Sequence, residues 1–178
     1  MRGRRTVAAA VAMLCVIAAL FNGGVSADAD DDATIDVDAG AVAAGADGKC
    51  SLVEAITNVS GRNQVWSDCP SGAGIVKIHL PAETYTLGAA LPAITQSVEI
   101  EGDGANTTII DGAATYPLVR AAGGGWLTVD GLTFRNGKSG QGGAIAAFNE
   151  TGTMNLTVRD SSFEHNTTSS GEGGAIYL

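Results

Sequence analysis

Apolar and polar positions alternate in three similar segments of the chain, which begin at positions 98, 127 and 156 and are therefore evenly spaced, at an interval of 29. The segments are Val98-Glu-Ile-Glu-Gly102, Leu127-Thr-Val-Asp-Gly131 and Leu156-Thr-Val-Arg-Asp160. Such alternation predicts a strand with one buried face, and recurrence at a fixed period is typical of stacked supersecondary units. The Gly-rich sequence between the segments has no helical periodicity. The pattern therefore predicts an all-β fold, a parallel β-solenoid whose coils bury their apolar faces on one another.

Similar short apolar runs predict further strands from residue 74 onward. The expected strands are 75–80, 85–87, 97–101, 108–111, 118–120, 127–130, 132–134, 144–147, 155–159, 162–164 and 175–178, with an earlier candidate at 34–37. Gly and Asn clusters such as Gly102-Asp-Gly104 and Asn136-Gly137 mark turns between them. We therefore assign residues 74–178 to the coils of the solenoid.

One segment has helical periodicity instead. Ser51 and Glu54 have the spacing of a capping box, and a helix is predicted from there to about Val59, ending before Ser60-Gly61. The positions that share its apolar face are Leu52, Ala55, Ile56 and Val59. The first coil of a solenoid exposes apolar side chains and unpaired backbone, so we expect the segment 49–73 to cap it.

The N-terminus has the organisation of a secretory signal. Three arginines (Arg2, Arg4 and Arg5) precede the apolar run 7–21, and the small residues Val25-Ser26-Ala27 predict cleavage after Ala27. A membrane anchor is the alternative, but the apolar run is shorter than the roughly 18–20 residues of a span. Cys15 would be removed with the signal. We expect a secreted protein, or one at the cell surface or outer envelope.

The chain is acidic, with a net charge of −9. Loss of the three signal arginines leaves 10 − 3 = 7 basic residues against 19 acidic ones, a net charge of −12. This charge argues against nucleic acid as a partner. Much of it lies in the acidic leader 28–48, where Asp28, Asp30, Asp31 and Asp32 begin a dense run. Calcium could bind there, but the loop pattern that ends in a bidentate Glu is absent, so we expect no cofactor.

Two cysteines remain after processing, Cys50 and Cys69. In an exported protein an isolated pair predicts a disulfide. Metal ligation is the alternative, but two cysteines without a nearby histidine or second pair make a poor site. The predicted bond would tie down the capping segment.

Several motifs carry a family resemblance. Gly48-Lys-Cys50-Ser-Leu-Val-Glu-Ala-Ile56 resembles the C-S-L-R-E-A motif of exported bacterial β-helix proteins, with Val53 in place of Arg. Gly142-Gly-Ala-Ile145, Gly173-Gly-Ala-Ile176 and Phe163-Glu-His-Asn166 are similar to the G-G-A-I and F-x-x-N repeats of polymorphic outer-membrane proteins and related adhesins, and Phe134-Arg-Asn136 is one residue short of that spacing. The resemblance covers roughly residues 34–178. It implies a right-handed parallel β-helix of the pectate-lyase-like type on an exported or surface protein, in many cases without a known reaction.

Residues at equal positions in successive repeats lie above one another in a solenoid, which places Glu101, Asp130 and Arg159 in one outward column. This column is either a polysaccharide site or a ladder of ion pairs, and we favour the ladder because surface ion pairs are common. These three residues are the catalytic candidates.

Other polar and aromatic residues have simpler interpretations. Asp103 and Asp111 adjoin glycines, as turn formers do, and Asn136 and Asn166 fall at near-equivalent corners where amides hydrogen-bond between coils. His79 and His165 have no nucleophile beside them in the sequence. Trp66 and Trp126 could stack on sugars, but they share no evident surface.

The leading hypothesis is an exported surface or adhesin-like scaffold that is not an enzyme and binds an extracellular glycan or protein on its outer face. The alternative is a pectate-lyase-like polysaccharide lyase or glycoside hydrolase that uses the three candidates. The chain stops at Leu178, directly after a G-G-A-I strand and without a polar closing segment. We therefore also expect a continuation or a partner at the last coil.

Overall fold

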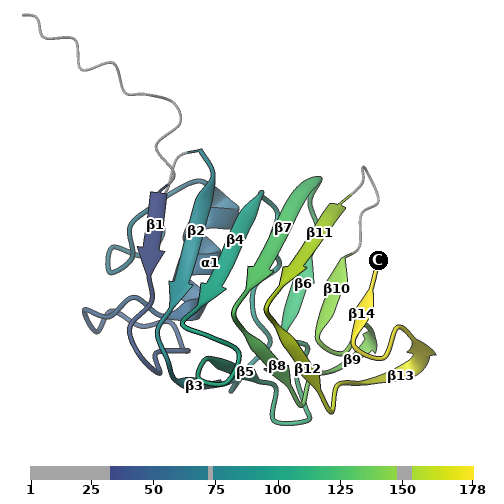
Figure 1. Cartoon of the computed structure of the whole chain (residues 1–178). Coiled ribbons are helices and arrows are strands. Elements are labelled where there is room, and N and C mark those ends of the chain that lie inside the picture. Colours follow the sequence, from purple (N-terminus) through teal and green to yellow (C-terminus); the bar gives the residue numbers. More distant parts are fainter. Residues whose placement is uncertain (1–32, 72–73, 148–153) are drawn as a thin grey trace, which may run out of the picture.

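The computed structural model describes residues 33–71, 74–147 and 154–178 (Figure 1). The predicted signal peptide at 1–27, Cys15 within it and the leader segment 28–32 lie outside the described residues.

Every strand pairing in the described part of the chain is parallel, and the strands form four sheets. Sheet A consists, in spatial order, of β1 (Ala33–Asp36), β2 (Val76–Leu80), β4 (Val98–Gly102), β7 (Gly125–Asp130) and β11 (Met154–Arg159). Sheet B consists of β3 (Thr84–Thr86), β5 (Ile109–Asp111), β8 (Thr133–Arg135) and β12 (Ser162–Glu164). Sheet C consists of β6 (Val119–Ala121), β10 (Ile145–Ala147) and β14 (Ile176–Tyr177), and sheet D of β9 (Lys138–Gln141) and β13 (Thr167–Glu172). The described fold is thus mostly β, and its small all-parallel sheets are consistent with a parallel β-helix-like arrangement.

The three repeated segments lie side by side in sheet A, in the predicted register. Leu127 pairs with Val98 on one side and with Leu156 on the other, and Val129 lies between Ile100 and Val158. The inward side chains of the first two repeats are buried, whereas those of the third are less covered. The alternation therefore identified the inward face correctly.

Aromatic packing links two neighbouring strands of sheet B. Phe134 on β8 pairs in register with Phe163 on β12, and their rings stack with centroids 5.2 Å apart. Phe134 is fully buried. Burial of a side chain of this size stabilises a fold by roughly 1.5–3 kcal/mol.

The apolar pattern did not reveal sheet D. Its strands read Lys-Ser-Gly-Gln and Thr-Thr-Ser-Ser-Gly-Glu, and neither buries an apolar face. Thr167 pairs with Lys138 at the interval that separates β7 from β11 in sheet A and β8 from β12 in sheet B. The register then shifts before Glu172 pairs with Gln141, at an interval of 31. The pairing of Ile176 with Ile145 in sheet C keeps this longer interval. The irregularity in sheet D therefore absorbs the extra length of the last repeat.

The predicted helix is present as α1 (Leu52–Gly61), and its capping box is formed. The Ser51 backbone N–H donates to Glu54 Oε2 at 2.9 Å, and the Glu54 N–H donates to Ser51 Oγ at 3.3 Å. The predicted end was too early, because the helix continues to Gly61 and ends where Arg62 adopts a left-handed backbone (φ 51°). The predicted apolar face is buried and belongs to the same core as the strands of sheet A.

The predicted disulfide is confirmed. Cys50 and Cys69 are bonded, with their Cα atoms 4.7 Å apart, and both residues are buried, one shortly before α1 and the other in the loop that follows it. Among the described residues, no helix is long and apolar enough to span a bilayer.

Asn136 and Asn166 lie at near-equivalent corners, as predicted, and their positions differ by one residue. Asn136 and His165 each follow the paired residues Arg135 and Glu164, and both have a left-handed backbone, with φ of 54° and 52°. Asn166 therefore corresponds to Gly137, and its side chain reaches into the preceding repeat. There its Oδ1 accepts from the Gly137 N–H at 2.8 Å and its Nδ2 donates to the Phe134 carbonyl at 2.9 Å. The amides do bridge repeats, as predicted, but from different corner positions.

Candidate functional site

The outward side chains of sheet A form a polar surface, here called the outer face. One row across it reads Asp36, His79, Glu101, Asp130 and Arg159, because these residues pair in register from β1 to β11. The adjacent row reads Thr34, Lys77, Glu99, Thr128 and Thr157. The structure thus brings the three catalytic candidates together on neighbouring strands.

These candidates are held in ion pairs. The Lys77 Nζ lies 2.7 Å from Glu101 Oε2, and its hydrogen bond to Glu101 is the main cause of a raised Lys77 pKa. Arg159 Nη1 lies 4.0 Å from both Asp130 Oδ2 and Glu99 Oε1. Glu101 therefore pairs with a lysine on the strand before it instead of with Arg159.

His79 is held at both ring nitrogens. Nδ1 lies 3.0 Å from Asp36 Oδ1, and Nε2 lies 3.1 Å from Asp103 Oδ1. Partial burial lowers the pKa of His79, but hydrogen bonds to Asp103 and Asp36, together with their charges, outweigh burial and raise it. The same contact with His79, followed by the Ala82 N–H, lowers the pKa of Asp103. A neutral imidazole has only one N–H to donate, so contact with a carboxylate at each ring nitrogen favours the imidazolium form.

Asp111 is also engaged in hydrogen bonds and an ion pair within the protein. Its Oδ2 accepts from Arg135 Nε at 2.9 Å and Nη2 at 2.7 Å, while its Oδ1 accepts from the Ala113 N–H at 2.9 Å. Asn136 Nδ2 contacts both oxygens, at 3.1 and 3.2 Å. Asp111 is thus a turn former, as predicted, and it also links β5 to β8.

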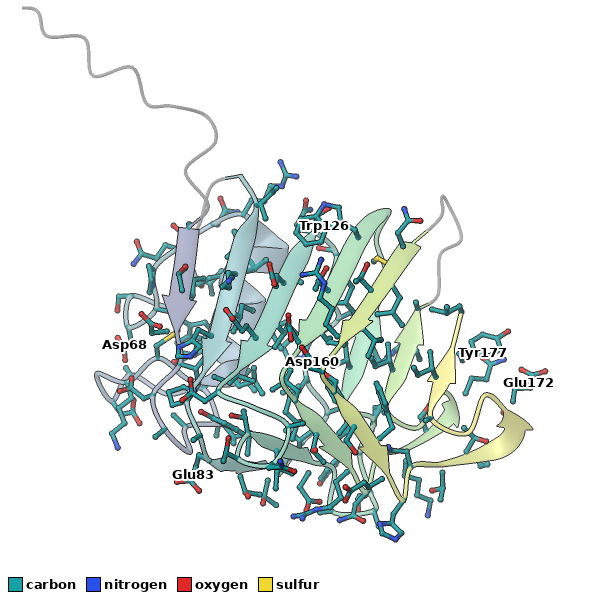
Figure 2. All side chains as sticks on the ribbon, in the orientation of Figure 1. Asp68, Glu83, Trp126, Asp160, Glu172 and Tyr177 are labelled. Atoms are coloured by element: carbon teal, nitrogen blue, oxygen red, sulfur yellow. A yellow bond between two sulfur atoms is a disulfide. The ribbon has the colours of Figure 1, made fainter. Side chains whose placement is uncertain are left out.

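A pocket of about 370 Å³ opens where α1 ends and the strands of sheet A begin, and we call it the Trp126 pocket. Its apolar lining includes Val59, Ile75, Val76 and Trp126. Its polar lining consists of Arg62, Gln96 and Ser97, and no carboxylate of the described residues lines it. Figure 2 shows Trp126 at the upper, N-terminal ends of the sheet A strands, away from Asp160 at their opposite ends.

Local contacts fix the walls of this pocket. Ser60 Oγ donates to the Ala93 carbonyl at 3.0 Å and Thr95 Oγ1 donates to the Ser60 carbonyl at 2.9 Å, so the end of α1 is tied to the segment that precedes β4. Arg62 Nε donates to Gln96 Oε1 at 2.7 Å. On the other wall, the Trp126 backbone N–H donates to Ser97 Oγ at 3.3 Å.

Sequence reasoning missed this pocket. Its residues come from a helix end, a loop and two strands, and no spacing in the chain relates them. One feature of the sequence did indicate that Trp126 is available to a ligand. It precedes the inward Leu127 in the same strand, so its side chain points outward. Trp66, the other tryptophan, does not line the pocket.

In the described parts of the chain, no group of three or more His, Cys, Asp or Glu side chains is placed to hold a metal ion. The early part of the acidic run lies outside these residues. Comparisons of the chain with protein-family models, with curated proteins and with solved structures gave no match. The family resemblance and the activity it implies therefore remain predictions.

Proposed function

We propose that this chain is an exported, right-handed parallel β-helix that acts as a surface or adhesin-like scaffold and binds an extracellular glycan without turnover. A protein ligand on the same face is the less favoured form of this hypothesis. The parallel sheets and their unbroken register across sheet A support the solenoid, and the buried Cys50–Cys69 bond suits an exported protein.

The observation that carries the proposal is the pairing of every ionisable candidate on the outer face. Glu101 is neutralised by Lys77, and Asp130 faces Arg159. Both nitrogens of His79 are occupied by carboxylates. A general acid or base needs an atom within hydrogen-bond reach of the proton that it transfers, and on the outer face these ion pairs engage such atoms. Side chains engaged in this way instead form a fixed pattern of charge and hydroxyls, which suits recognition.

The lyase or hydrolase alternative has one observation in its favour. Glu99, Glu101, Asp130 and Arg159 lie on adjacent strands of one exposed sheet, where a polysaccharide could reach them. If they act on a substrate, the ion pairs must open when it binds.

A combined screen separates the two functions. The mature chain is applied to a glycan array and to polysaccharide depolymerisation assays that detect unsaturated or reducing ends, with and without calcium. We expect glycan binding without release of new ends. Turnover that is lost in Asp130→Asn or Arg159→Gln, but kept in the control Glu164→Gln on sheet B, would establish the enzyme instead. Absence of binding to any glycan would refute the proposed function.

A further inference from the structure

The Trp126 pocket combines an aromatic wall with a cation, Arg62, that has no acidic partner among the described residues. Arg62 forms no ion pair with any described residue, and its Nε is engaged only by the neutral Gln96. Neither terminal nitrogen of its guanidinium has a hydrogen-bond partner in the described parts of the chain. Lys49, Arg120 and Lys138 also form no ion pair among the described residues, but of these cations only Arg62 lines the pocket.

The backbone holds this guanidinium at the pocket. Arg62 ends α1 in a left-handed conformation, and its own N–H donates to the Val59 carbonyl. The bond from Nε to Gln96 Oε1 then directs the side chain toward the segment before β4. A planar guanidinium fixed at Nε still offers its terminal N–H groups, which suit a carboxylate or a sulfate.

The opposite wall suits a ring. Trp126 is half-buried, so part of its indole face is accessible, and its indole N–H has no partner among the described residues. Indole rings pack against the apolar faces of cyclic ligands, and the polar edge donates to their substituents. Gln96 and Ser97 add amide and hydroxyl groups beside it. The volume of about 370 Å³ lies at the small end of the roughly 300–1,000 Å³ of ligand sites, which fits one or two sugar rings.

We propose that the Trp126 pocket binds an anionic sugar residue, with the sugar ring against Trp126 and its carboxylate or sulfate on Arg62. This inference deepens the proposed function and rests on it, because the pocket would select which glycan the scaffold holds. The net negative charge of the chain opposes an anion at long range. Screening at physiological ionic strength limits that repulsion to about 8 Å, and no carboxylate of the described residues lines the pocket.

The pocket adjoins the outer face, because Trp126 belongs to the strand of sheet A that also carries Thr128 and Asp130. Trp126 pairs in register with Asn155 on β11, and Ser97 precedes Val98, the partner of Leu127. A sugar residue in the pocket could therefore extend as a longer chain over the polar surface of sheet A. A small anion site at one end of a longer polar track is the arrangement expected for recognition of a glycan terminus.

The test measures binding of methyl β-glucuronide, glucose 6-sulfate and the neutral methyl β-glucoside to the mature chain. A Trp66→Phe background leaves Trp126 as the only tryptophan, so its fluorescence reports the pocket directly. We expect at least one of the anionic sugars to bind and change this fluorescence, and the neutral glucoside to bind about tenfold more weakly or not at all. The glucuronide and sulfate arms decide which anion is preferred.

Two arginine variants provide a matched pair. Arg62→Gln should weaken binding of the anionic sugar about tenfold, whereas Arg120→Gln, at an exposed position in sheet C, should leave it unchanged. Circular dichroism of both variants checks that the fold is retained. Trp126→Ala removes the fluorescent reporter, so its binding is measured by titration calorimetry, and we expect none. If Trp126→Ala does not fold, Arg62→Gln still tests the inference.

The inference fails if the neutral glucoside binds as well as the anionic sugars, or if the two arginine variants behave alike. It also fails if a peptide with a free C-terminal carboxylate displaces or outcompetes the sugars. In each case, glycan-array binding that survives Arg62→Gln would leave the proposed scaffold function intact. An array without any binding would remove the proposed function itself.

Discussion

The ion pair between Asp111 and Arg135 should contribute measurably to stability, because it is one of the few charged contacts in the described residues with a buried partner. The Asp111 side chain is 12% exposed and that of Arg135 is 33% exposed. Replacing Asp111 with Ala removes two bonds from Arg135, the contacts with Asn136 and the bond from the Ala113 N–H.

A hydrogen bond to a charged group contributes about 1.5–3 kcal/mol, and breaking a buried ion pair costs about 3–5 kcal/mol. Arg135 is one third exposed and can regain water, so the cost must lie below the second range. We therefore expect Asp111→Ala to lower the free energy of unfolding by about 2–3 kcal/mol. Asp111→Asn keeps an acceptor for the Ala113 N–H and should cost about 1–2 kcal/mol.

The assay is urea unfolding at pH 7, followed by circular dichroism, with the exposed Glu83→Ala as the control. A double-mutant cycle with Arg135→Met isolates the coupling between the two side chains. A loss below about 0.5 kcal/mol for Asp111→Ala, or no coupling in the cycle, would refute the assignment, because such values are typical of surface pairs.

The dependence on pH follows from the lowered pKa of Asp111. Partial burial raises this pKa, but the bonds from Ala113, Arg135 and Asn136 more than offset burial. The stabilisation is therefore present above the unfolded pKa of about 3.9 and is lost as pH falls through the lower folded value. The difference between wild type and Asp111→Ala should shrink below about pH 4.

Three further changes test other parts of the fold. His79→Gln should destabilise the chain more at pH 5.5 than at pH 8.5. Because the pKa of His79 is raised in the folded state, its contacts with Asp36 and Asp103 stabilise the fold below the unfolded pKa of about 6.5, and this stabilisation is lost as the pH rises through the folded pKa. Urea midpoints at the two pH values measure this. Gly137→Ala should cost at least about 2 kcal/mol or prevent folding, because a Cβ there would overlap the Gly143 carbonyl and crowd the Asn166 amide; thermal unfolding measures this. The double variant Cys50→Ser/Cys69→Ser opens a loop whose ends are 19 residues apart in sequence, and its free energy of unfolding should fall by about 3 kcal/mol. Urea unfolding measures this loss, and the wild-type chain with reductant should show a loss of the same size.

Each of these predictions has a contrary outcome. Equal effects of His79→Gln at both pH values would show that a charged His79 does not pair with Asp36 and Asp103. Gly137→Ala should be compared with Gly140→Ala, where a Cβ meets no atom, and equal stabilities would contradict the close approach. An unchanged urea midpoint after reduction would show that the disulfide constrains nothing.

The strands that could be predicted were those with one apolar face. In the segments beginning at 98, 127 and 156, alternation specified which side chains point inward, and a constant spacing specified their register. Sheet D was not predicted because its residues are polar on both sides, so no periodicity distinguishes these strands from loops. The one-residue offset between the corners of Asn136 and Asn166 was readable from the sequence, but the contacts of Asn166 with Gly137 and Phe134 were not.

The candidate site was predictable only in part, for a related reason. The column of Glu101, Asp130 and Arg159 follows from the constant spacing of the repeats, but Lys77 pairs in register with Glu99, over a shorter interval of the chain. This shorter interval breaks the repeat, so the ion pair between Lys77 and Glu101 could not be read from the sequence. The Trp126 pocket depends on where the end of α1 is tied down, through bonds at Ser60 and Thr95 that no pattern encodes.

The register shift in β13 has a consequence for how this fold can vary. Sheets A and B keep a constant interval between the last two repeats, and the additional length is accommodated between Thr168 and Glu172 before sheet C resumes pairing. That segment is mostly exposed and contributes no apolar side chain to the core. Loops grafted there should leave the neighbouring strands aligned, whereas a single residue inserted in β7 or β8 would turn inward side chains outward. Sheet D is thus the face on which a chain of this type can gain or lose residues, during divergence or by design, without a change in the side chains that form its core.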